Sequence, residues 1–147
     1  MPIIDITTKI KENWDKVFEI VEDMERFPEF MRDVKAIKLL RQDPDGSRIF
    51  QWEADIDGTP VEWVERNKVE KDANRIGFKM IEGDFQQFEG YWQISTIPGG
   101  SVLRLFSRFE WGVPNFEKYI GHILEDKASR SIRGMLWAVR KRAKRGQ

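Results

Sequence analysis

Cysteine is absent from the chain, and histidine occurs once among 147 residues. Without cysteine there is no disulfide framework and no thiolate to serve as a metal ligand or nucleophile. A single histidine nearly excludes the usual zinc sites and the Ser/His and Cys/His catalytic pairs. Most hydrolase mechanisms are therefore excluded, and we expect neither a metal site nor a cofactor.

An excess of charge of either sign is also missing. Lys plus Arg and Asp plus Glu each number 25, so the net charge is zero. A neutral domain has no long-range field of one sign that would single out nucleic acid or an anionic membrane as the partner of the whole domain, so any such binding would be local and nucleic acid is not an expected partner. No segment reaches the ~20 apolar residues that span a bilayer, and acids and bases interrupt the N-terminus, unlike a signal peptide. We therefore expect a soluble cytoplasmic protein, either a monomer or a weak homodimer, without a transmembrane segment.

The length and the hydrophobic periodicity predict one α+β domain over residues 1–147. Residues 3–10 alternate as a strand, and residues 14–24 repeat apolar side chains at i, i+3, i+4 and i+7, as a helix does. Turn signals divide residues 34–111 into six strands in meander order. One apolar stripe follows over residues 115–144 and predicts a long helix. A strongly curved antiparallel sheet wrapped on this helix would leave a hollow between them.

Aromatic side chains gather on the dry face of this sheet. Phe50 and Trp52 alternate with Gln51 and Glu53, as in an antiparallel sheet with one face in water. The number of rings on the one dry face of a small domain favours a cavity between the sheet and the last helix. Its expected apolar lining is Phe50, Trp52, Trp63, Phe78, Met80, Phe88, Trp92, Leu105 and Phe109.

Several polar residues share that inward face. Glu65 and Asn67 follow Trp63 at a spacing of two, and Ser107 lies among large apolar neighbours. Lys127 and Ser131 fall inside the apolar stripe of the last helix. We expect these residues to form a polar patch in a ligand cavity. Alternatively, the strand of Glu65 lies near an edge, where both groups reach solvent, and Lys127 extends to the rim.

Gly90 interrupts a strand between Phe88 and Trp92, where a packed sheet favours bulk. The missing side chain either leaves a hollow rimmed by aromatic rings or allows another backbone to approach closely. It is also typical of a β-bulge that bends the sheet. All three interpretations suit a sheet curved around a cavity, so Gly90 joins the candidate site.

Three long segments carry a resemblance to a known group of proteins. They are VFEIVEDMERFPEFMRDVKAIKLL (17–40), VEWVERNKVEKDANRIGFKMIEGDFQQFEGYW (61–92) and GGSVLRLFSRFEW (99–111). With the long last helix, they resemble the polyketide cyclase/dehydrase and coenzyme Q-binding group of the START-like (SRPBCC, Bet v 1-like) superfamily. The resemblance implies a helix-grip fold, in which a seven-stranded antiparallel sheet surrounds a C-terminal helix and encloses a pocket for a hydrophobic ligand.

The resemblance implies two functions. Aromatase/cyclases of this superfamily dehydrate a poly-β-keto chain with a pocket arginine, and that position falls on Asn67 here, while other polar pocket positions fall on Val34, Ser107 and Ser131. The neighbouring Arg66 points to the opposite face of its strand. Glu65 and Lys127 are then the candidate base and acid of a cyclase or dehydratase. The quinone- and lipid-binding branch needs only an apolar cavity, so the sequence favours a binding protein for a polyketide, a quinone or other isoprenoid, or a lipid over an enzyme.

A third hypothesis uses the basic end of the chain, RKRAKRGQ. Some bacterial members of the group that the chain resembles associate with ribosomes, and these cations would contact RNA phosphates. The helix macrodipole alone also explains cations at a helix C-terminus. Because the net charge is zero, we expect RNA binding to be absent.

Overall fold

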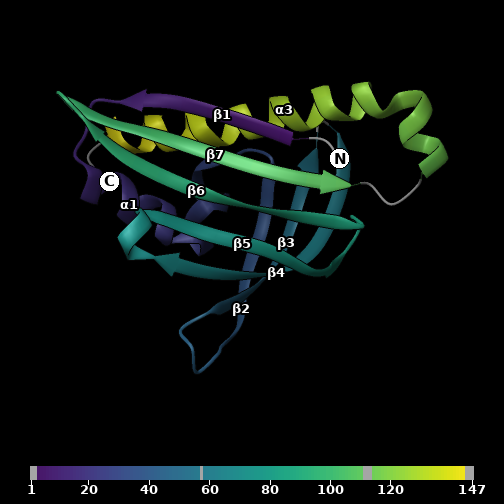
Figure 1. Cartoon of the computed structure of the whole chain (residues 1–147), viewed down its shortest axis with the longest axis horizontal. Helices are drawn as coiled ribbons and strands as arrows, with labels where there is room; N and C mark the ends of the chain where they lie inside the picture. Colours follow the sequence, from purple (N-terminus) through teal and green to yellow (C-terminus); the bar gives the residue numbers. More distant parts are fainter. Residues whose placement is uncertain (1–2, 57, 111–113, 145–147) are drawn as a thin grey trace.

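The computed structural model describes residues 3–56, 58–110 and 114–144, with side chains of the last helix described from residue 125 onward. Seven antiparallel strands form one sheet (Figure 1). Their spatial order is β1 (Ile3–Ile10), β7 (Gly100–Glu110), β6 (Gln87–Ile97), β5 (Arg75–Gly83), β4 (Thr59–Glu70), β3 (Arg48–Ile56) and β2 (Val34–Gln42). The predicted meander of six strands is confirmed, and β1 closes the far edge by pairing with β7.

Helices lie on one side of this sheet. The long helix α3 (Pro114–Lys144) runs beside β1, and the short elements α1 (Trp14–Glu22), η1 (Met24–Arg26) and α2 (Phe27–Phe30) connect β1 to β2 (Figure 1). A 3-10 turn, η2 (Lys71–Ala73), joins β4 to β5. The predicted α+β helix-grip fold is therefore confirmed. Within the described ranges, no helix is both long enough and apolar enough to cross a membrane.

The first helix is held to the sheet by its apolar face. Val17, Phe18 and Val21 are buried, at the spacing that the sequence predicts. The indole Nε1 of Trp14 donates a hydrogen bond of 3.2 Å to the carbonyl oxygen of Ile94 on β6. Asn13 occupies the N-cap position, although its side chain makes no capping hydrogen bond. This packing places η1 against the concave face of the sheet.

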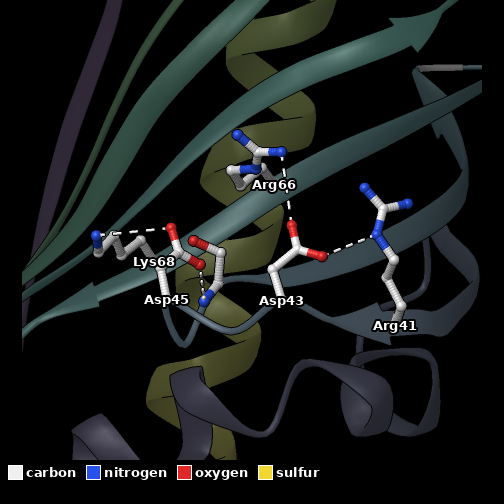
Figure 2. A network of polar contacts seen from close by, with 6 residues as sticks. Arg41, Asp43, Asp45, Arg66 and Lys68 are labelled. Carbon is white, nitrogen blue, oxygen red and sulfur yellow. Dashed lines mark hydrogen bonds and ion pairs between the residues drawn. The ribbon is translucent and has the colours of Figure 1, made fainter.

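The two faces of the sheet differ as strand alternation requires. On the convex face, Arg66 contacts Asp43 at 3.6 Å and Lys68 contacts Asp45 at 3.9 Å, which fastens β4 to the loop between β2 and β3 (Figure 2). Arg41 adds a hydrogen bond of 2.9 Å to Asp43. Exposed pairs of this kind contribute roughly 0–1 kcal/mol each. Arg66 therefore points away from the concave side, as the sequence predicts.

Gly90 allows two backbones to approach closely. A Cβ atom added there would lie 1.9 Å from the carbonyl oxygen of Phe106 on β7. The pairing of β6 with β5 and with β7 continues through Gly90 without a register shift, so the bulge interpretation is wrong. Register shifts occur instead at two places in β2 and between Val64 and Glu65 in β4. Glycine is required at position 90 because the neighbouring strand leaves no room for a side chain.

The space between sheet and helices is partly solid. Leu136, Val139 and Ala143 from the C-terminal half of α3 are at most 1% exposed, and they join the same core cluster as Met24 and Phe27. Toward the middle of α3 the packing opens into a cavity. The concave face is thus divided into a packed end beside the short helices and a hollow end.

Candidate functional site

The cavity lies between α3 and the concave face of the sheet. The space open to the centres of water-sized molecules is about 80 Å³, and on this measure one water molecule needs roughly 10–15 Å³. Its volume therefore accommodates several water-sized groups. The lining residues are Asp33, Val34, Trp52, Ala54, Asp55, Ile56, Trp63, Glu65, Phe78, Phe85, Phe88, Trp92, Leu105, Ser107, Phe109, Ala128, Ser131, Ile132 and Met135.

Aromatic rings form the wall on the sheet side. Trp52 and Trp63 face each other on β3 and β4, and their rings stack with centroids 5.2 Å apart. Phe88 packs edge-on against Trp63 at 5.4 Å and tilted against Phe78 at 5.1 Å. Strand pairing brings these side chains together, because residues at alternate positions of adjacent strands share one face of the sheet. The wall is a rigid apolar surface suited to a flat or hydrophobic molecule.

Glu65 places a carboxyl group inside this apolar wall. Its side chain is 3% exposed, and Oε1 accepts a hydrogen bond of 2.7 Å from the indole Nε1 of Trp63. Burial raises the pKa of Glu65 from 4.5 to about 7, although hydrogen bonds from Trp63 and Asn67 act in the opposite direction. A carboxyl group with this pKa exchanges a proton near neutral pH, so the cavity holds a group able to donate or accept one.

Three further polar atoms of lining residues have no hydrogen-bond partner among the described residues. They are the indole Nε1 of Trp52, Oδ1 of Asp55 and the hydroxyl oxygen of Ser131. Ser107, which is fully buried, donates only a long hydrogen bond of 3.4 Å to the carbonyl oxygen of Ile4. Leaving a buried polar group unpaired costs on the order of 1–3 kcal/mol. A ligand that hydrogen-bonds to these groups would recover part of that cost.

Many of the candidate ligand-binding residues line the cavity. These are Trp52, Trp63, Glu65, Phe78, Phe88, Trp92, Leu105, Ser107, Phe109 and Ser131. The interpretation that Glu65 and Asn67 reach solvent at a sheet edge is wrong, because β4 is an interior strand and the two side chains are 3% and 1% exposed.

Five candidates lie outside the lining: Phe50, Asn67, Met80, Gly90 and Lys127. Phe50 and Asn67 share the concave face but belong to its packed end, where the Asn67 amide nitrogen lies 3.0 Å from the sulfur of Met24. Met80 is partly buried and packs against the core, and Gly90 is covered by the backbone of β7. Lys127 is partly buried on α3 without facing the cavity. Alternation gives the face of a residue, but only the packing of the helices decides which part of that face is hollow.

Several residues of the lining were not predicted from the sequence. Phe85 lies in the connection between β5 and β6, where no strand alternation assigns it a face, yet it is 6% exposed and contacts Trp63. Asp33 and Asp55 are partly exposed, and the backbone N–H of Asp55 donates to the carbonyl oxygen of Asp33 at 2.7 Å. Ile56 follows Trp52 and Ala54 on β3 at a spacing of two residues, and all three line the cavity. Among the described residues, no group of three or more His, Cys, Asp or Glu side chains is arranged to hold a metal ion.

Comparisons with known proteins agree with this architecture. The model of the family "Polyketide cyclase / dehydrase and lipid transport" matches residues 13–136. A solved structure of a Thermus thermophilus protein is similar with a TM-score of 0.91, 19% identity and coverage of 99% of both chains. A START superfamily protein of Mycobacterium smegmatis is similar with a TM-score of 0.81, 19% identity and coverage of 99% of both chains.

A third similar structure is an aromatase/cyclase of a Streptomyces species, with a TM-score of 0.83, 17% identity and coverage of 98% of this chain and 94% of that chain. At these identities the solved structures show the common fold alone. The family match spans most of the chain and confirms the resemblance seen in the sequence. This chain therefore belongs to the polyketide cyclase/dehydrase and lipid transport family.

Proposed function

We propose that the protein binds a small hydrophobic molecule in the cavity between the sheet and α3. The aromatic wall supports this function because stacked and edge-on rings present a large apolar surface without flexible side chains. Polyketides, quinones, other isoprenoids and lipids all meet this description. The described structure favours a ligand with a small ring or a short chain, since the cavity measures about 80 Å³.

The observation that carries the proposal is the presence of unpaired polar atoms in a mostly apolar lining, two of which can donate a hydrogen bond. Trp52 Nε1 can only donate a hydrogen bond, whereas the hydroxyl of Ser131 can donate or accept. A ligand with a carbonyl or ether oxygen would satisfy the indole. The ligand we propose is therefore apolar over most of its surface and carries at least one oxygen acceptor.

Native mass spectrometry of protein purified gently from its own host tests this function first, because a tightly held hydrophobic ligand survives such purification. A fluorescence titration with 1-anilinonaphthalene-8-sulfonate, an apolar probe, tests whether the cavity is accessible. Absence of any co-purified molecule together with absence of probe binding would contradict the proposal.

A pair of matched tryptophan variants tests the role of the indole. Trp52→Phe keeps an aromatic ring in the wall but removes the donor, so affinity for an oxygen-bearing ligand should fall a few-fold to about tenfold. Trp137→Phe is the control, because Trp137 is 55% exposed and lies outside the lining. Equal effects of the two variants would show that the Trp52 indole contributes no specific hydrogen bond.

A second candidate function is a cyclase or dehydratase acting on a poly-β-keto substrate. The observation that favours it is Glu65, a buried carboxyl in the cavity whose pKa is raised to about 7. Lys127 is not in the lining, so the proposed catalytic group is Glu65 alone. Turnover of a poly-β-keto surrogate that Glu65→Gln abolishes would support catalysis. Ligand binding without turnover in the wild-type protein would leave the binding function only.

A further inference from the structure

The charges of this neutral chain are strongly segregated. From Lys127 to the last residue the sequence contains eight Lys and Arg residues and no Asp or Glu. The preceding residues carry an equal excess of acid, because Lys plus Arg and Asp plus Glu both number 25 overall. The described part of this basic segment belongs entirely to α3. The zero net charge therefore conceals one strongly basic helix.

Part of this charge forms a row on the exposed face of α3. Arg133, Trp137, Lys141 and Lys144 are all exposed, and their spacing of four, four and three residues places them on one side of an α-helix. Arg140 flanks the row, with its guanidinium 5.3 Å from the ring centroid of Trp137. We call these five residues the Trp137 stripe. Trp137 is 55% exposed, the highest value among the exposed large hydrophobic residues that the structure describes.

Contacts among the described residues do not explain this stripe. Arg142, on another side of α3, pairs with Glu29 at 3.2 Å and lies over the ring of Phe30. Within the described ranges, no ion pair reaches the four cations of the Trp137 stripe. The helix macrodipole favours cations only in the last turn, so it accounts for Lys141 and Lys144 but neither for Arg133 nor for an exposed indole.

We propose that the Trp137 stripe docks the protein onto an anionic lipid surface. The negative potential of such a surface attracts Lys and Arg side chains, and tryptophan rings are enriched at the boundary between headgroups and acyl chains. The stripe is a straight row about 16 Å long, from 1.5 Å per helical residue, so it can lie flat on a bilayer. Single-stranded RNA fits less well, because successive bases require successive aromatic platforms and this stripe has one.

Docking would place the ligand cavity close to the lipid. Ala128, Ser131, Ile132 and Met135 line the cavity from the same helix. One face of α3 would then contact the bilayer while another contacts a hydrophobic molecule. This consequence depends on the ligand-binding function proposed above, but the docking itself does not.

Sedimentation with vesicles tests the docking without any ligand. We expect binding to vesicles of phosphatidylcholine mixed with phosphatidylserine, weak or no binding to phosphatidylcholine alone, and loss of binding at high salt. The double variant Arg133→Glu/Lys141→Glu should weaken binding at least tenfold, since each cation contributes roughly fivefold. The matched control Lys35→Glu/Lys38→Glu changes the net charge equally on the exposed edge strand β2 and should bind as the wild type does.

The position of the indole gives an independent readout. Lipids brominated on their acyl chains should quench part of the tryptophan fluorescence of the wild type, and Trp137→Phe should remove that part. Circular dichroism verifies that all variants remain folded.

The proposal would be overturned by equal binding to neutral and anionic vesicles, or by equal loss in the two double variants. It would also be overturned by salt-sensitive RNA binding in a filter assay, lost in Arg133→Glu/Lys141→Glu, without any vesicle binding; that result would assign the stripe to RNA. Because no ligand is present in these assays, none of these results bears on the function proposed for the cavity.

Discussion

Replacing Glu65 with glutamine should make the protein more stable at alkaline pH. The pKa of Glu65 is raised from 4.5 to about 7 by burial. Between these two values the unfolded chain releases a proton that the folded chain retains, so the free energy of unfolding falls as the pH rises. This loss of stability begins near pH 4.5 and is complete above about pH 7. At 1.36 kcal/mol per pKa unit, the free energy of unfolding falls by on the order of 3 kcal/mol.

The glutamine variant removes this penalty and keeps an acceptor for the hydrogen bond from Trp63 Nε1. The assay is urea unfolding of both proteins at several pH values between 4 and 9. The difference in free energy of unfolding between variant and wild type should be small at the acid end and grow in favour of the variant toward pH 8. Taking the difference cancels the contributions of all other titrating groups.

Glu62→Gln provides the matched control. Glu62 lies on the same strand, with its side chain exposed on the opposite face. The Glu62→Gln control should show no comparable increase in the free energy of unfolding, relative to the wild type, as the pH rises. If the difference between Glu65→Gln and the wild type stayed constant with pH, the reasoning about the buried carboxyl would be refuted, since a merely structural effect of the substitution does not titrate.

Two further predictions concern single contacts. Gly90→Ala should destabilise the fold by at least about 1–3 kcal/mol, because the new methyl group meets the backbone of β7. The control Gly134→Ala lies in open space on α3 and should stabilise the fold by up to about 1 kcal/mol. Equal effects of the two variants in thermal unfolding would contradict this prediction. Trp63→Phe removes a hydrogen bond that lowers the pKa of Glu65. In the urea experiment, the upper end of the pH range over which Glu65 lowers the stability should therefore rise, while the lower end near pH 4.5 stays in place. An unchanged upper end would show that the bond does not favour the carboxylate.

Local patterns in the sequence were enough to predict most of the fold and the character of the cavity wall. Side chains alternate along a strand whatever its neighbours are, so the inward positions of Trp52, Trp63, Glu65 and Ser107 could be predicted without knowing which strands pair. The amphipathic stripe likewise predicted the long helix. The net charge alone does not reveal the basic end of α3, because it averages these cations with acids elsewhere in the chain.

What no local pattern contains is the distance between segments that are remote in the sequence. Gly90 has no side chain because β7 passes too close, and Phe85 reaches the cavity although it lies in a connection. Asn67 and Phe50 share the inward face with Glu65, yet Met24 of η1 lies against Asn67, and that end of the hollow is packed. Periodicity assigns a side chain to a face because it depends on neighbouring residues only. Whether that part of the face is packed or open depends on how helices and strands from the whole chain meet, and only the tertiary structure decided it.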